Sequence, residues 1–120
     1  MELIDEIEEL IMMHQEGPYW DFKREWYDDS KDGDLLIDII CMANNLVDRD
    51  AYIIIGVNEE CDYAIQDVSQ DANRRNTQML TDFIRGKKFA GDFRPVVTVE
   101  QVHLDGGLVD VIVVHNSINT

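Results

Sequence analysis

The sequence predicts an α+β domain with a mixed or antiparallel sheet of about five to six strands and two to three helices. Three patterns support this fold class. Residues 2–14 repeat apolar side chains at helical spacing. Residues 52–55 form an uninterrupted β-prone run, which is typical of an interior strand covered on both faces. Residues 105–107, Asp-Gly-Gly, join two β-branched runs and indicate a tight hairpin.

An amphipathic helix followed by a strand is predicted before residue 27. The helix covers residues 2–14 and keeps its acidic side chains away from its apolar stripe. Residues 19–26 then alternate as a strand does. One face of this strand is expected to carry Trp20, Phe22, Arg24 and Trp26. Asp21 and Lys23 therefore share the other face.

A second helix is predicted over residues 35–46, ahead of the interior strand. Asp32 or Asp34, in the polar loop before it, can accept hydrogen bonds from the free N–H groups of its first turn. The helix is apolar almost all round, so we expect it to be sandwiched between the sheet and another layer.

The second half of the chain is predicted to hold a short strand, a third helix and the hairpin. Residues 63–68 are expected to pair beside the interior strand, and a hairpin through the turn at residues 58–62 is one way to do so. Residues 72–85 have the apolar spacing of an amphipathic helix. Residues 96–104 and 108–115 are the hairpin strands, and residues 111–114 are apolar enough to lie inside the sheet.

Length and composition predict a single domain over residues 1–120, which we expect to be the N-terminal module of a longer protein. A hydrophobic content of 45% excludes wholesale disorder. The acidic start differs from a signal peptide and the apolar runs are too short to span a membrane, so a cytoplasmic location and no membrane partner are expected. Cys41 and Cys61 lack the spacing of a zinc site, and no disulfide is implied.

The net charge of −15 is unevenly distributed. Residues 1–60 carry 17 acids and 4 bases, whereas residues 61–120 carry 8 acids and 6 bases. Because Lys and Arg supply most of the affinity for phosphates, a nucleic-acid surface is expected in the second half. The candidate nucleic-acid-binding residues are Arg74, Arg75, Arg85, Lys87, Lys88 and Arg94. Solvated helix ends balanced by Asp82 and Asp92 explain the same residues equally well.

Carboxylates near Lys23 are the best candidates for chemistry. Glu16 and Asp21 lie close to it in the chain, and Glu59 or Glu60 follows the interior strand. Carboxylates can bind Mg²⁺ or Mn²⁺, which activates water, while a lysine steadies a scissile phosphate. An ordinary salt bridge across strands is the simpler explanation and is favoured on the residues alone.

Other catalytic signals are weak. His14, His103 and His115 have no metal-ligand spacing and are better explained as structural residues. The sequence contains neither GxxxxGK[ST] nor GxGxxG, so no nucleotide-binding motif is present.

Three segments together resemble the Schlafen-type AlbA domain, a family widely described as DNA-binding. They are Asp21-Phe22-Lys23, residues 38–44 and residues 52–57, and the resemblance covers about residues 16–116. It implies an Alba-like fold and a DNA or RNA partner.

The resemblance also assigns roles to the carboxylates. Schlafen ribonucleases use an acidic triad, which corresponds here to Glu16, Asp21 and Glu59, with Lys23 in the same motif. The three carboxylates are then the metal ligands and, with Lys23, the catalytic residues. Asp21 is shorter than the usual Glu, and this chain has one lobe where those nucleases pair two. A homodimer can supply the second lobe.

Three functions follow as hypotheses. The first is a nucleic-acid-binding module of a bacterial or phage-type regulatory protein. The second is a metal-dependent endoribonuclease that uses Mg²⁺ or Mn²⁺. The third is a dimerisation or protein-interaction module, suggested by the strong negative charge.

Overall fold

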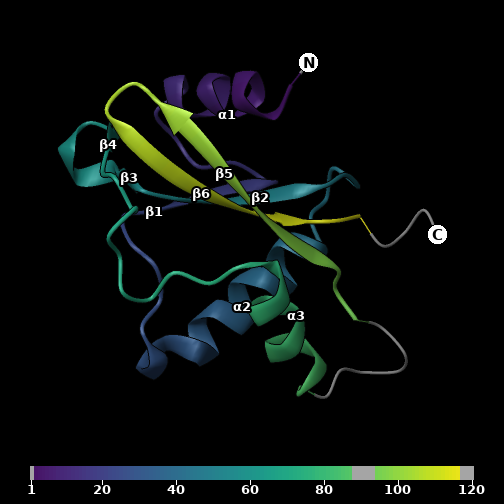
Figure 1. The fold of residues 1–120 in the computed structure, drawn as a ribbon. Helices are drawn as coiled ribbons and strands as arrows, with labels where there is room; N and C mark the ends of the chain where they lie inside the picture. The colour runs from purple at the N-terminus through teal and green to yellow at the C-terminus, as the bar shows by residue number, and fades with distance from the viewer. Residues whose placement is uncertain (1, 88–93, 117–120) are drawn as a thin grey trace.

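The structure is a computed structural model that describes residues 2–87 and 94–116. In this part of the chain it has three helices, a mixed four-stranded sheet of order β1-β2-β6-β5 and a two-stranded sheet of β3 and β4 (Figure 1). The larger sheet consists of β1 (Trp20–Lys23), β2 (Ala51–Ile55), β5 (Val97–Leu104) and β6 (Gly107–Val114). The smaller consists of β3 (Val57–Asn58) and β4 (Ala64–Ile65). The predicted α+β class is confirmed.

The interior strand is β2, as predicted. It pairs with β1 in parallel and with β6 in antiparallel orientation, and all five of its residues are buried. Alternate side chains of β2 enter opposite faces, because successive residues of a strand point to opposite sides. Ile53 and Ile55 belong to one core cluster, and Tyr52 and Ile54 belong to the other.

The helices cover both faces of the sheet. Helices α2 (Asp32–Ala43) and α3 (Thr77–Arg85) lie on one face, and α1 (Leu3–Met12) lies on the other (Figure 1). Ile7 and Leu10 of α1 are buried against the second cluster. Within residues 2–87 and 94–116, no helix is long and apolar enough to cross a membrane.

Helix α2 differs from its prediction in two ways. It starts at Asp32, directly after a short 3-10 helix (Asp29–Lys31), and its N-cap position is Lys31, without a side-chain cap. The expected capping by Asp32 or Asp34 is therefore wrong. The helix is also not sandwiched, since the side chain of Ile37 is 59% exposed on its outer side.

Helix α3 starts later than predicted, at Thr77. Asn76 caps it by accepting a hydrogen bond from the backbone N–H of Met79 at 2.8 Å. Arg74 and Arg75 consequently precede the helix. This displacement lets both side chains reach distant carboxylates, as described below.

Strand β1 is shorter than predicted and ends at Lys23. Trp26 is buried, but it packs with the cluster on the face opposite to Trp20 and Phe22, so the predicted common face is wrong for this residue. The segment after β2 forms the expected hairpin through residues 58–62, but β4 pairs with β3 and not with the interior strand itself. Gly56 separates β2 from β3 with a φ of 116°, where an added Cβ would lie 3.1 Å from the Gln66 carbonyl oxygen.

The hairpin is confirmed. Strands β5 and β6 pair from Val97↔Val114 to Leu104↔Gly107, with Asp105 and Gly106 in the turn. Strand β6 lies between β2 and β5, as its apolar sequence predicts. Cys41 and Cys61 are both free and exposed.

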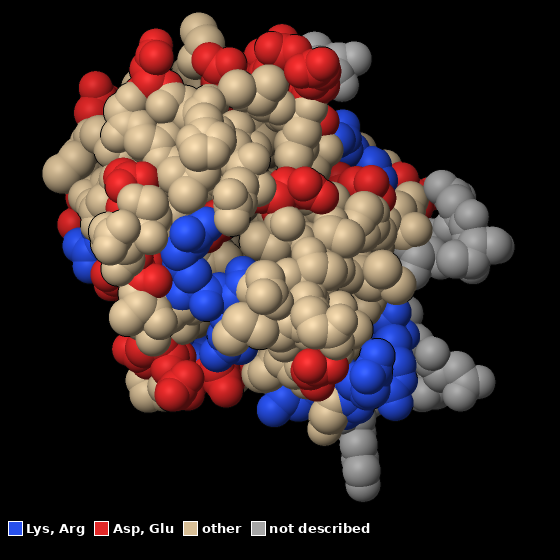
Figure 2. Space-filling model, in the orientation of Figure 1, with Lys and Arg blue, Asp and Glu red and all other residues tan. Residues whose placement is uncertain are grey.

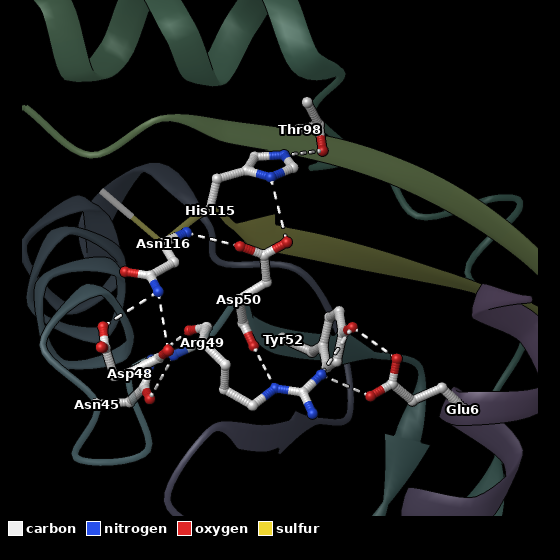
Figure 3. Close-up of polar contacts among 9 residues, drawn as sticks. All are labelled: Glu6, Asn45, Asp48, Arg49, Asp50, Tyr52, Thr98, His115 and Asn116. Carbon is white, nitrogen blue, oxygen red and sulfur yellow. Dashed lines mark hydrogen bonds and ion pairs between the residues drawn. The ribbon is translucent and has the colours of Figure 1, made fainter. Parts of the chain in front are cut away.

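Hydrogen bonds from polar side chains hold the connection between α2 and β2 in place (Figure 3). Asn45 organises its turn by donating to the carbonyls of Met42 and Arg49 at 3.0 and 2.7 Å. Asp50 then accepts from the backbone N–H of Asn116 at 2.6 Å and lies 3.6 Å from the ring of His115. These bonds fix the end of β6 against the start of β2.

Arg49 connects the same region to α1 on the other face of the sheet (Figure 3). Its guanidinium donates to Glu6 at 2.6 Å and to the Tyr52 hydroxyl at 3.2 Å. It also stacks 4.0 Å from the centre of the Tyr19 ring. The acidic helix α1 is thus attached by charge as well as by its apolar stripe.

Candidate nucleic-acid interface and carboxylate site

The site around Lys23 joins strand β1 to helix α2. The Lys23 ammonium lies 3.2 Å from Asp21 Oδ2 on its own strand and 3.5 Å from Asp38 Oδ2 on the helix. The Tyr27 hydroxyl donates to the same Asp38 oxygen at 2.6 Å. Sequence reasoning did not include Asp38 or Tyr27 in the site. The signal that could have identified Asp38 is that it is the only carboxylate of this helix beyond the first turn, among apolar neighbours.

The surroundings of Asp21 make its ionised form less favourable than that of an ordinary aspartate. Burial, followed by the contact with the Glu16 carboxyl group, raises the pKa of Asp21 to about 6, although Lys23 acts in the opposite direction. The Asp21 side chain is 16% exposed. Burial lowers the pKa of Lys23, but the carboxylates of Asp21 and Asp38 outweigh it and the net shift is upward. Burial and the hydrogen bond to Asp38 raise the pKa of Tyr27.

Two of the three predicted triad carboxylates lie together. Glu16 contacts Asp21, and Glu16 Oε2 accepts from the backbone N–H of Phe22 at 3.4 Å. Glu59 belongs to a 3-10 helix (Glu59–Cys61) and lines a pocket of about 280 Å³ with Lys23 and Arg24. Lys23 thus contacts one member of the carboxylate pair and lines the same pocket as Glu59.

A metal ion does not fit these side chains as they are arranged. Among the described residues, no three or more His, Cys, Asp or Glu side chains form a group that could hold one. Mg²⁺ requires near-octahedral oxygen ligands, whereas Asp21 is paired with Lys23 and burial disfavours its ionised form. Metal binding by Glu16, Asp21 and Glu59 would require their side chains to rearrange, and it stays a prediction.

Arg74, a predicted nucleic-acid-binding residue, is used inside the fold. Its guanidinium donates through Nε and Nη2 to the two oxygens of Asp110, at 2.8 and 2.9 Å. Asp110 is 1% exposed and also accepts from Trp26 Nε1 at 2.7 Å. The ion pair neutralises a buried carboxylate, as such groups require.

Arg75 is also bound internally. It donates to Asp32 at 2.6 Å, and its guanidinium lies 5.2 Å from the centre of the Phe83 ring. Only 12% of its side chain is exposed. Both arginines before α3 therefore stabilise the fold, and their charges are already paired with carboxylates of the domain.

Three other predicted cations lie at the surface near the end of α3. Arg85 is 71% exposed, Lys87 lies 4.7 Å from the centre of the Phe83 ring, and Arg94 is exposed. Figure 2 shows Lys and Arg side chains gathered over this end of α3 and the entry to β5. We call Arg85, Lys87 and Arg94 the α3-end cations. Lys88 lies outside the described residues.

A family model described as "Schlafen, AlbA_2" matches residues 16–120. The chain belongs to this family. The matched region of the AlbA_2 domain begins at Glu16 and contains every described strand, whereas α1 precedes it. Membership indicates a nucleic-acid-binding or related domain. No curated protein and no solved structure matches the chain.

Proposed function

We propose that this AlbA_2 domain binds nucleic acid through the α3-end cations. The observation that carries the proposal is that these cations keep their charge available to a ligand. Arg85 lies 3.6 Å from Asp82, and both side chains are well exposed, so this pair contributes little. Arg94 donates to a backbone carbonyl, that of Arg85, at 3.1 Å. Phosphate groups can replace such contacts at small cost.

Salt should weaken the binding strongly. Three phosphate contacts give a slope of log affinity against log salt of about −2 for a single strand and about −2.7 for a duplex. Affinity should therefore fall about 15- to 40-fold between 50 and 200 mM salt. The net charge of −15 repels nucleic acid from the rest of the domain, which makes low salt the condition for detection.

Charge reversal at the α3-end cations tests the proposal. We expect Arg85→Glu/Arg94→Glu to weaken oligonucleotide binding at least tenfold and to reduce the magnitude of the salt slope by about 1.4 for a single strand or about 1.8 for a duplex. Fluorescence anisotropy measures both quantities. Arg24→Glu/Lys31→Glu makes the same charge change among exposed residues elsewhere and should have a much smaller effect. Equal losses in the two variants, or no loss in the first, would contradict the proposed surface.

Metal-dependent RNA cleavage is a second candidate function. It is favoured by the pairing of Asp21 with Glu16 beside Lys23, because perturbed carboxyl groups cluster at catalytic sites. If the site rearranges to bind metal, RNA should be cut with Mn²⁺ and not with EDTA, and Asp21→Asn should abolish cutting. Glu100→Gln, at an exposed carboxylate of β5 that belongs to neither candidate site, is the control that should still cut. If Asp21→Asn cuts RNA at the native rate, the cleavage does not come from this carboxylate site.

A homodimer and a protein-interaction role stay predictions. Light scattering of the purified domain distinguishes a monomer from a dimer directly. A monomer that binds nucleic acid would remove the need for a second lobe in the first proposal. It would count against the ribonuclease that pairs two lobes.

A further inference from the structure

A pocket of about 310 Å³ lies among the α3-end cations. It is formed between the end of α3 and the segment leading into β5, and its lining residues are Thr81, Ile84, Arg85, Arg94, Pro95, Val96 and Val97. The lining is divided between apolar side chains and two guanidinium groups. A site of this size and composition can enclose a small planar apolar group and bind an adjacent anion.

The floor of the pocket is part of the folded core. Ile84 and Val97 are each 4% exposed, and Pro95 is buried. Val96 is 61% exposed, so apolar surface also reaches the mouth. The floor of the pocket is therefore formed by residues that the fold holds in place.

The two arginines are linked across the pocket. Arg94 Nη1 donates to the carbonyl oxygen of Arg85 at 3.1 Å, which leaves the remaining N–H groups of its guanidinium for a ligand. Lys87 adds a third positive charge nearby, over the Phe83 ring. An apolar hollow between cations is complementary to a base attached to phosphates.

Duplex nucleic acid does not match this arrangement. In a duplex the bases are paired and stacked, so only phosphates and base edges are accessible to a protein surface. A single strand can turn one base out of its stack and place the face of that base on apolar side chains. The apolar floor would have no role if only phosphates were bound.

We infer that the pocket accepts one unstacked base of a single-stranded nucleic acid, while Arg85 and Arg94 hold the phosphates on either side. This inference rests on the proposed nucleic-acid binding and specifies its substrate class. Binding is then selective for single strands, and it depends on the presence of a base as well as on charge.

An abasic strand keeps the phosphates and lacks the base. It therefore measures the contribution of the base to affinity without any change in the protein. We expect the native domain to bind a thymidine strand about 5- to 10-fold more tightly than an abasic strand of the same length and charge. A duplex of the same length should bind no better than the abasic strand. Fluorescence anisotropy at low salt measures all three affinities.

A filled pocket provides the second test. Thr81→Phe adds bulk to the pocket lining without changing charge and should lower thymidine-strand affinity to that of the abasic strand, with abasic binding unchanged. Gln78→Phe adds the same side chain at an exposed position of α3 outside the pocket and is the matched control. Thermal melting by circular dichroism checks that both variants are folded.

Each outcome decides the inference. Equal affinity for thymidine and abasic strands, tighter duplex binding, or equal losses in Thr81→Phe and Gln78→Phe would overturn it, while salt-dependent binding would still support the proposed function. An acidic peptide that competes as well as the thymidine strand would overturn it in favour of a protein partner. Absence of binding to any strand would overturn both the pocket and the proposed function.

Discussion

Arg74→Ala is expected to destabilise the domain by about 3 kcal/mol, the largest effect of any single substitution proposed for this chain. The substitution leaves Asp110 buried with a full charge and only the Trp26 N–H as a partner. Removing one member of a buried ion pair costs about 3–5 kcal/mol, and the lower value applies because Arg74 is 27% exposed. Urea denaturation gives the change in the free energy of unfolding.

A double-mutant cycle shows whether the loss comes from the unpaired charge. Asp110→Asn removes the charge and keeps an oxygen that can accept from Trp26. Combined with Arg74→Ala, it should recover about 2 kcal/mol relative to the sum of the two single substitutions. Arg75→Ala is the neighbouring control and should cost only about 1 kcal/mol, since its partner Asp32 is 41% exposed. If the free energy of unfolding of Arg74→Ala equals that of the native domain, this arginine does not have the structural role described.

This prediction also separates folding from binding. Measured where the variant remains folded, Arg74→Ala should bind oligonucleotides as the native domain does, because its charge is neutralised by Asp110. A loss of binding comparable with that of Arg85→Glu/Arg94→Glu would extend the nucleic-acid surface to the start of α3.

The elements that could be predicted from the sequence are those specified by local patterns. The apolar run of β2 and the turn at Asp105 and Gly106 determine their structures within a few residues. The start of α3 could not be predicted this way. Arg74 is separated from Asp110 by 36 residues, and Arg75 from Asp32 by 43. Such contacts hold the segment before Thr77 outside the helix, although its composition permits one.

The same reason explains what was missed at the candidate site. Asp21 and Lys23 share one face of a strand, which alternation alone predicts. Asp38 joins them only because α2 packs on that face of the sheet. The basic residues of the second half were predicted to form one surface, but in the structure they divide into internal ion pairs and surface cations, according to which carboxylates the fold brings near.

Asp21→Asn is expected to stabilise the domain by about 2 kcal/mol at neutral pH. In the native protein, burial and the Glu16 carboxyl group raise the pKa of Asp21 from 3.8 to about 6, so its ionised form is disfavoured by the fold. This rise in the pKa corresponds to about 3 kcal/mol. Part of this gain is offset in the variant, because Lys23 loses one of its two carboxylate partners.

The sign of the pH dependence follows from the direction of the shift. The folded state holds the Asp21 proton more tightly than the unfolded chain, so this group contributes its full stability below pH 3.8 and loses it as the pH rises to about 6. The difference in unfolding free energy between Asp21→Asn and the native domain should therefore be small near pH 4, grow through pH 5 and level off above pH 6. Urea denaturation across this range measures that difference.

Glu16→Gln provides the control for the cause of the shift. It removes the neighbouring carboxyl group and leaves burial, so the pKa of Asp21 should fall by less than the whole shift, which carbon-detected NMR of the Asp21 carboxyl group can follow. An Asp21→Asn variant that is less stable than the native domain above pH 6 would show that the ion pair with Lys23 outweighs desolvation. A stabilised variant would instead show that the fold retains Asp21 at a cost in stability. Such a cost is expected where a carboxyl group serves binding or catalysis.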